Sequence, residues 1–169
     1  LWKHQLTRFP RRPRIQWETQ LQLMLEKYPH SSGRITGHSE LTWQADIRPS
    51  ELSETYRVEV RGKPYSFPHV WVSGRGIDCC KDLSVVPHKF GKEEKPNRIQ
   101  ICLQKGDWNA WLPLAETLVP WAMEWLVQYE IWLCTGTWNG SGIHPKESHA
   151  NKRGPNHRAA SMKVKPRLT

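Results

Sequence analysis

The chain has 169 residues with a formal net charge of +9, and 37% of its residues are hydrophobic, including ten tryptophans. This length and apolar content suit one domain with a real core and are short for two. No run of about 18 apolar residues occurs, and the N-terminal region lacks the apolar stretch of a signal peptide, so we expect a cytoplasmic protein that neither spans a membrane nor is exported.

The positive charge comes from the two ends of the chain. Residues 1–14 carry five basic groups and no acidic one, and residues 146–169 carry seven basic groups and one acidic group. The remaining 131 residues hold the other 13 basic groups and 15 of the 16 acidic ones. A nucleic-acid-binding surface needs basic residues built into a folded face. We therefore expect a basic N-terminal extension (1–14), one slightly acidic domain (15–145) and a basic C-terminal tail (146–169), with nucleic-acid binding through the ends as a weaker alternative.

The first predicted element is a helix, followed by strands. Apolar residues recur at spacings of three and four from Trp17 to Tyr28, and Pro29 with the "HSSG" turn closes this helix. Alternating apolar and polar residues then predict three antiparallel strands at "ELTWQADIRP", "TYRVEVRG" and "HVWV". The residues of the first strand expected on the core face are Leu41, Trp43, Ala45 and Ile47.

The second half combines a long loop, a short extended piece and helices. The segment "SGRGIDCCKDLSVVPHKFGKEEKPN" shows neither period, and long loops in compact domains tend to be functional. "RIQICL" follows as the extended piece. Helical spacing then begins near Leu112, with Pro120 in a first turn and Gly136 as the stop. The order predicts an α+β fold with an N-terminal helix, an antiparallel meander, a cysteine-bearing loop and C-terminal helices that the sheet faces.

The four cysteines are expected to be free thiols. They are few for a disulfide-stapled secreted domain, and the adjacent Cys79 and Cys80 pair only through a strained ring. No spacing matches a zinc site, and His144 and His149 stand in a polar tail. We therefore expect no metal and no other cofactor.

Cys102 has two interpretations from the residues alone. A free cysteine bracketed by Ile101 and Leu103 is ordinarily a small buried hydrophobe. The alternation of apolar residues, however, puts Cys102 on the polar face with Gln100 and Gln104, where its thiol meets solvent. The pattern leaves the nucleophile and the buried hydrophobe as equal alternatives.

Several neighbours of Cys102 in the sequence bear on its chemistry. Arg98 and Lys105 lie close along the chain and favour a thiolate. His88 and Asn97, in the preceding loop, are candidates to handle a proton or to donate a hydrogen bond.

The order of elements resembles the ubiquitin-conjugating enzyme fold, in which the catalytic cysteine lies in an I-C-L triplet after the last strand and a tryptophan follows shortly. "ICL" at 101–103 and Trp108 stand in those places. More specifically, "GHSELTWQADIRPSELSETYRVEVRGKPYSFPHVWV", "PHKF" and "LAETLVPWAMEWLVQYEIWLCTGTWNGSGIHP" resemble the stand-alone bacterial ubiquitin-conjugating-enzyme-like proteins of CBASS anti-phage operons. The resemblance covers roughly residues 35–145 and leaves out both ends.

This resemblance implies a function. In those operons a protein of this kind works beside a cGAS/DncV-like nucleotidyltransferase, which makes a cyclic-nucleotide alarm signal. The resemblance implies that Cys102 is the nucleophile of an acyltransferase that forms a thioester with the C-terminal carboxyl group of that nucleotidyltransferase and so regulates the signal. A catalytically silent scaffold of the same fold that binds the nucleotidyltransferase is the alternative.

The sequence departs from the eukaryotic family near the cysteine. That family places a His-Pro-Asn tripeptide about ten residues before its cysteine, and the asparagine is held to help the oxyanion form. Here Pro87-His88 is in reversed order and fourteen residues upstream, and Asn97 stands five residues before Cys102. We take His88 as a loop-ordering or oxyanion-side residue and Asn97 as a second candidate.

Two further features near the site have alternative interpretations. Asp107 is either a carboxylate for an acceptor amine or, as we favour, the N-cap of a helix at "WNAW". The glycine-rich "TGTWNGSGIHP" after the long helix is either a turn that covers the helix end, which we favour, or a segment that closes over the active site.

Overall fold

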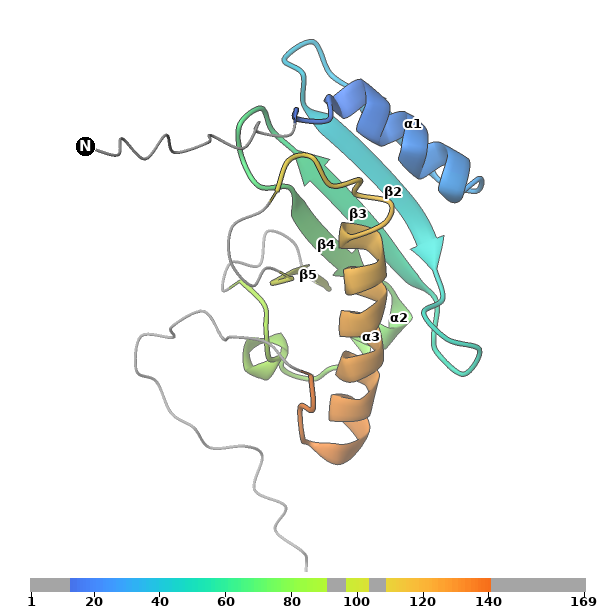
Figure 1. The fold of residues 1–169 in the computed structure, drawn as a ribbon. Helices are drawn as coiled ribbons and strands as arrows, with labels where there is room; N and C mark the ends of the chain where they lie inside the picture. The colour runs from blue at the N-terminus through green and yellow to red at the C-terminus, as the bar shows by residue number, and fades with distance from the viewer. Residues whose placement is uncertain (1–12, 91–96, 104–108, 141–169) are drawn as a thin grey trace, which may run out of the picture.

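The computed structural model of the chain describes residues 13–90, 97–103 and 109–140. The elements are α1 (Trp17–Lys27), β1 (Ser32–Ile35), β2 (Leu41–Ile47), β3 (Tyr56–Gly62), β4 (His69–Ser73), α2 (Arg75–Asp78), a 3-10 turn (Leu83–Val85), β5 (Arg98–Ile101) and α3 (Leu118–Thr135). Figure 1 shows a sheet with α1 at one end and the long α3 running along its face. The predicted α+β class is therefore confirmed.

The strands form one antiparallel sheet. Within the described residues its order is β1-β2-β3-β4-β5, so each strand pairs with its neighbour in sequence. The register aligns Trp43 with Val60, Val60 with Val70, and Val70 with Ile101, which makes an apolar row across four strands. The alternation predicted for β2 is confirmed, because its four apolar residues from Leu41 to Ile47 are buried while the three polar residues between them are not.

The strand β1 is a correction to the sequence prediction, which assigned "HSSG" to a turn. The turn is confined to Pro29–His30, and Ser32–Ile35 pair with residues 41–44 of β2. Serine and glycine have low strand propensity, and three of the four β1 residues are exposed, so no apolar alternation marks this segment. Backbone pairing with β2 creates the strand.

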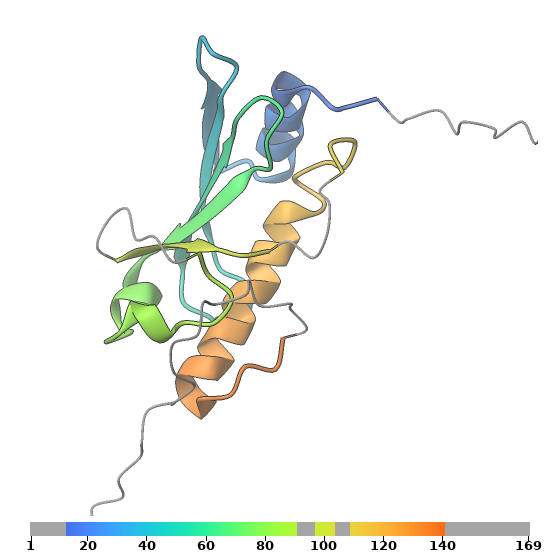
Figure 2. The same ribbon diagram turned by 90° about the vertical axis from the view of Figure 1, so that its left-hand side faces the viewer.

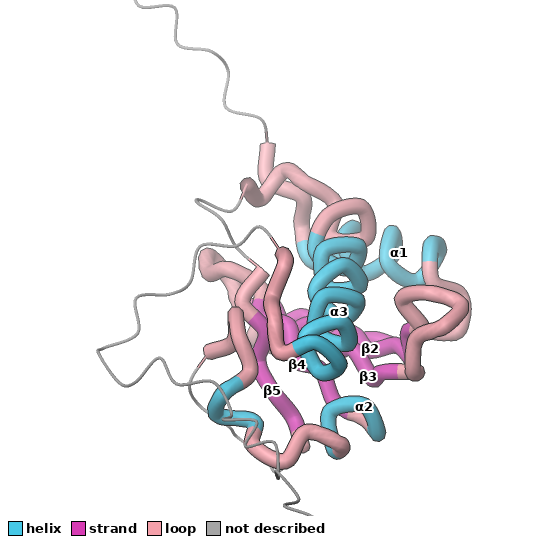
Figure 3. Tube along the Cα trace, turned by 90° about the horizontal axis from the view of Figure 1, so that it is seen from below, coloured by secondary structure: helices cyan, strands magenta, loops and turns pink. Residues whose placement is uncertain are grey.

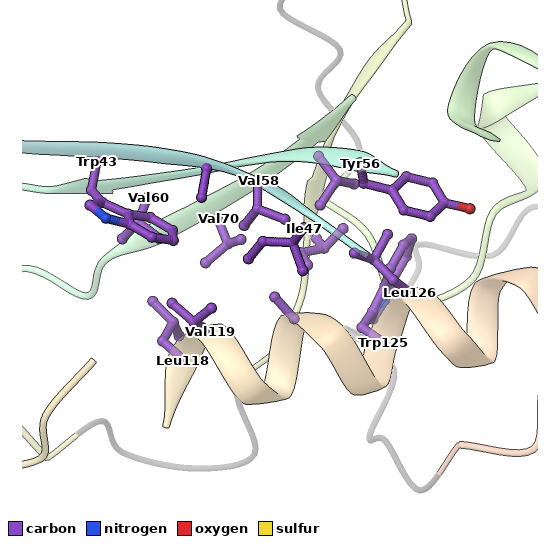
Figure 4. Packing of buried hydrophobic residues seen from close by; sticks show 14 of the residues in the cluster. Trp43, Ile47, Tyr56, Val58, Val60, Val70, Leu118, Val119, Trp125 and Leu126 are labelled. Atoms are coloured by element: carbon purple, nitrogen blue, oxygen red, sulfur yellow. The ribbon is translucent and has the colours of Figure 1, made fainter. Parts of the chain in front are cut away.

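Both long helices cover the same face of the sheet, as Figures 2 and 3 show. Helix α1 packs against β1 and β2. In Figure 4, side chains of α3 point towards the strands and those of β2, β3 and β4 point back towards the helix. The buried residues that α3 contributes are Leu118, Val119, Ala122, Trp125, Leu126 and Tyr129. Burial of such large apolar side chains contributes about 2 kcal/mol each, so this contact holds the two layers together.

The first-turn proline and the glycine stop predicted for α3 are confirmed, but the predicted start near Leu112 is wrong, because residues 109–117 form turns and bends and the helix begins at Leu118. Pro120 lies in the first turn, where a missing backbone N–H costs nothing. Gly136 ends the helix in the left-handed conformation, with φ of +71°, and its N–H donates to the carbonyl of Trp132 at 2.8 Å. None of the helices in the described part of the chain has the length and apolarity needed to cross a membrane.

The outer face of the sheet is held by charged groups. Glu59 on β3 forms ion pairs with Arg61 and with Arg98, the latter at 3.3 Å, and the Arg98 guanidinium lies 4.6 Å from the centre of the Trp71 ring. Arg98 is only 9% exposed. The first residue of β5 is therefore fastened to β3 and β4 by its side chain as well as by its backbone.

Replacing Leu126 with alanine should destabilise the protein by about 2 to 5 kcal/mol, because the side chain is fully buried where α3 meets the sheet and its loss leaves a cavity. Urea unfolding of the purified protein measures this change. Trp121→Ala on the exposed side of the same helix is the control and should cost less than about 1 kcal/mol. Equal losses in the two variants would contradict the layer contact described above.

Candidate active site

Cys102 is the first residue after β5 and is partly exposed. The preceding residue, Ile101, is 2% exposed and lies in the core. The following residue, Leu103, is partly buried and packs against the core. The backbone N–H of Cys102 donates to the carbonyl oxygen of His88 at 2.8 Å. Cys102 thus follows the end of a strand whose backbone is held in place, and as a residue it is partly exposed, unlike the buried Ile101.

A short segment before β5 extends the sheet and brings His88 to Cys102. Lys89 pairs with Ile101 in an antiparallel bridge, and the N–H of Phe90 donates to the carbonyl of Gln100 at 2.9 Å. With the Cys102–His88 hydrogen bond, these contacts form a small ladder. It places His88 opposite Cys102 although the two are fourteen residues apart in sequence.

His88 is buried in an unusual backbone conformation. It is 6% exposed and has φ of +52°, in the left-handed region. Histidine is one of the few residues besides glycine that is enriched there. Its carbonyl accepts a second hydrogen bond, from the indole Nε1–H of Trp125 on α3 at 3.1 Å. The backbone of His88 therefore connects the cysteine to the long helix.

Trp138 packs against the His88 ring and against Trp125. The Trp138 and His88 ring centres are 5.1 Å apart, and the Trp138 and Trp125 ring centres are 5.5 Å apart. After Gly136 the chain turns back along α3, as Figures 1 and 2 show, which carries Trp138 to this position. The described part of the glycine-rich segment, residues 137–140, thus reaches the neighbourhood of the cysteine as well as covering the end of the helix.

Asn97 is not brought together with His88 and Cys102. It is exposed, has φ of +65°, and precedes the first residue of β5, whereas Cys102 follows the last. Five residues of extended chain span roughly 16 Å at about 3.3 Å per residue. In its left-handed conformation Asn97 suits a turn into β5, a position in which asparagine is tolerated.

Arg98, which the sequence places close to Cys102, has side-chain contacts with β3 and β4. Its guanidinium faces Glu59 and Trp71 on the outer side of the sheet. Lys105, Asp107 and Trp108, for which the sequence predicts roles near the cysteine, lie outside the described residues.

The other three cysteines occupy different surroundings. Cys79 and Cys134 are exposed, and the half-buried Cys80 thiol donates to the carbonyl of Asp82 at 3.4 Å. All four cysteines are thiols outside disulfide bonds, as the sequence predicts. In the described ranges no group of three or more His, Cys, Asp or Glu side chains is arranged to hold a metal ion. His144 and His149 lie outside these ranges.

The aromatic residues beside His88 are the part of the site that the sequence reasoning missed. Trp125 and Tyr129 are stacked with ring centres 5.3 Å apart, and the Tyr129 hydroxyl donates to the carbonyl of Gly76 at 3.2 Å. Burial, and secondarily the neighbouring Cys80 thiol, raise the pKa of Tyr129, so this hydroxyl stays a protonated donor near neutral pH. The signal in the sequence that could have indicated this contact is the glycine-rich stretch around Trp138, because glycines let the chain turn back closely against α3.

The chain was compared with known proteins. The family described as Type II CBASS E2 protein has a model that matches residues 20–145. This range includes all the residues of the candidate site described above. No curated protein matches the chain.

The backbone conformation of His88 predicts that glycine and alanine substitutions at this position reverse their usual order of protein stability. Glycine ordinarily costs about 0.5 to 1 kcal/mol relative to alanine, but a left-handed φ costs a non-glycine residue about 1 to 2 kcal/mol. We therefore expect His88→Gly to be at least as stable as His88→Ala in urea unfolding, although both lose the imidazole ring. At Gln44, an exposed residue of β2, the same pair should keep the ordinary order, with alanine the more stable. A less stable glycine variant at position 88 would refute the conformational argument.

Proposed function

The chain belongs to the family of Type II CBASS E2 proteins, and from this premise we propose that it is a cysteine-dependent acyltransferase. Its Cys102 forms a thioester with the C-terminal carboxyl group of a cGAS/DncV-like nucleotidyltransferase and thereby regulates anti-phage signalling. The reaction takes place in the cytoplasm, where thiols stay reduced.

The position of Cys102 is the observation that carries this proposal. A nucleophile that receives the end of another protein chain has to be reachable from outside and yet fixed in place. Cys102 is partly exposed, it directly follows β5, and its N–H is held by the His88 carbonyl at 2.8 Å. Cys79 and Cys134 are exposed as well, but they lie in a short-helix turn and at the last turn of α3, respectively.

The step itself is a nucleophilic acyl substitution. The Cys102 thiol loses its proton, and the sulfur attacks the carbonyl carbon of an activated C-terminus. A carbon–sulfur bond forms while the bond to the leaving group breaks, and the leaving group departs with the electron pair. The chain carries no phosphate-binding glycine motif with which to activate a carboxylate. In this proposal the activated donor, an acyl-adenylate or another thioester, comes from a partner enzyme or from exchange with an already activated bond.

The oxyanion that develops in this step requires hydrogen-bond donors near the carbonyl oxygen. The N–H of Cys102 already donates to His88, which argues against it as such a donor. The burial of the His88 ring against Trp138 supports the loop-ordering role of His88 over a role beside the oxyanion.

Cys102→Ala should abolish a covalent adduct with the nucleotidyltransferase, because no other group on the chain replaces the sulfur. The wild-type protein, incubated with the nucleotidyltransferase and its activated donor, should give an adduct that a thiol reductant releases. Cys102→Ser should give an oxygen ester that resists the reductant. Intact-protein mass spectrometry and gels with and without reductant measure all three.

Cys134→Ala is the matched control, since it removes an exposed cysteine in the last turn of α3 and should leave the adduct unchanged. A reductant-sensitive adduct that survives in Cys102→Ala would refute the proposed nucleophile. Equal anti-phage protection by wild type and Cys102→Ala, with complex formation intact, would favour the silent scaffold instead.

The role of Asn97 is tested by removing its amide in two ways. If the amide stabilises the oxyanion, Asn97→Ala and Asn97→Gly should both slow adduct formation about 100-fold or more. Its position at the far end of β5 leads us to expect adduct formation within about threefold of wild type in Asn97→Gly, with Asn97→Ala the less stable protein because of its positive φ. Single-turnover adduct formation and urea unfolding give the two measurements.

A further inference from the structure

We propose that Trp138, in the segment that follows α3, is a positioning residue for Cys102. It holds His88 in its left-handed conformation and so fixes the carbonyl that receives the Cys102 amide. This inference rests on the proposed function for its catalytic consequence, whereas its structural part concerns the backbone of Cys102 alone.

The carbonyl oxygen of His88 is the shared point of contact. It accepts the N–H of Cys102 at 2.8 Å and the indole N–H of Trp125 at 3.1 Å. A carbonyl that receives two donors from different elements has a fixed direction. That direction depends on the φ of His88, which at +52° lies in a region that residues other than glycine keep only when their surroundings hold them there.

Trp125 is itself held from the core side. It is 5% exposed, stacks on Tyr129 at 5.3 Å, and the Tyr129 hydroxyl is tied to the carbonyl of Gly76 at 3.2 Å. The indole N–H that donates to His88 therefore belongs to a side chain that is buried in the core.

Trp138 packs against both His88 and Trp125. Its ring lies 5.1 Å from that of His88 and 5.5 Å from that of Trp125, so it contacts both the strained residue and the donor to that residue. The His88 ring therefore packs between the segment that follows α3 and the loop that carries His88. Removing the indole of Trp138 would therefore remove the packing contact that keeps the His88 side chain buried.

Two glycines make this return of the chain possible. Gly136 turns the backbone at the end of α3 with φ of +71°. At Gly140 an added β-carbon would lie 2.7 Å from Nε1 of Trp138 and 3.3 Å from Cγ of Gln128 on α3. Because a contact of 2.7 Å is too short for a carbon atom, alanine at 140 has to displace the rigid indole. Gly140→Ala therefore disturbs Trp138 without changing any aromatic residue.

The experiment measures amide hydrogen exchange by NMR in the ¹⁵N-labelled full chain. Trp138→Ala should raise the exchange rate of the Cys102 amide at least tenfold relative to the amides of Val58 and Val60 in the centre of the sheet. Trp138→Phe keeps an aromatic ring against His88 and should restore most of the protection. A rise of equal size at all these amides, or no rise at Cys102, would overturn the proposal.

Trp132→Ala is the matched control. Trp132 is another half-buried tryptophan of the same region, but its ring contact is with Tyr129, at 6.0 Å, and not with His88. It should lower the overall stability while leaving the exchange of Cys102 unchanged relative to Val58 and Val60. The same selective loss of protection at Cys102 in Trp132→Ala would show a general effect of α3 and overturn the specific role of Trp138.

Thioester formation gives the second readout. With a saturating activated donor, Trp138→Ala should reduce the single-turnover rate about tenfold, and Trp138→Phe should stay within about threefold of wild type. If wild type forms no thioester, the proposed function fails while the exchange experiment still decides the role of Trp138. If wild type forms it and Trp138→Ala forms it at the wild-type rate, positioning fails and the proposed function stands.

A second variant covers the case in which Trp138→Ala does not fold. Gly140→Ala keeps every side chain around His88 and should raise exchange at Cys102 in the same selective way, by about fivefold or more. Unchanged exchange at Cys102 in Gly140→Ala would contradict the proposal, because the displaced indole would then have no effect on the cysteine.

Discussion

The hydrogen bond from the Cys102 amide to the His88 carbonyl is the constraint on which the site depends. At 2.8 Å it closes a small ladder that continues β5 past its last strand residue. Strand alternation then decides what each side chain does: Ile101 faces the core and Cys102 does not. This backbone contact leaves Cys102 partly exposed at the end of β5, a position that suits the proposed nucleophile.

The end of β5 is held by the pairing and packing of the whole sheet. Apolar residues run across β2 to β5 in one register, and α3 covers that row. On the outer face, Arg98 fastens the start of β5 to Glu59 and Trp71. A slip by one residue would move Ile99 and Ile101 to the outer face and bury the polar residues between them, so register is strongly specified. The place of the cysteine follows from that register.

The parts of the fold with strong periodicity could be predicted from the sequence, and the parts held by backbone contacts could not. The alternation in β2 and the helical spacing of α3 indicate which face of each element is buried, because apolar residues occupy the positions that face the core. β1 has no such pattern, since its exposed serine and glycine are held by pairing with β2. In the site, I-C-L pointed to Cys102, but the meeting of His88 with Cys102 depends on a ladder between distant segments. Asn97 shows the opposite: it is closer to Cys102 in sequence than His88 is, but the length of β5 separates Asn97 from Cys102 in space.

The same reasoning explains why a strained residue stands beside the cysteine. A left-handed φ at His88 costs free energy, and residues in such conformations persist only where neighbouring groups over-determine them. Here the neighbours are two tryptophans, one from the buried face of α3 and one from the segment after it. Tryptophan suits this task because its large ring packs in the core while its N–H still reaches an acceptor. Through these contacts, Trp125 and Trp138 connect the helix layer to the backbone that pairs with the cysteine.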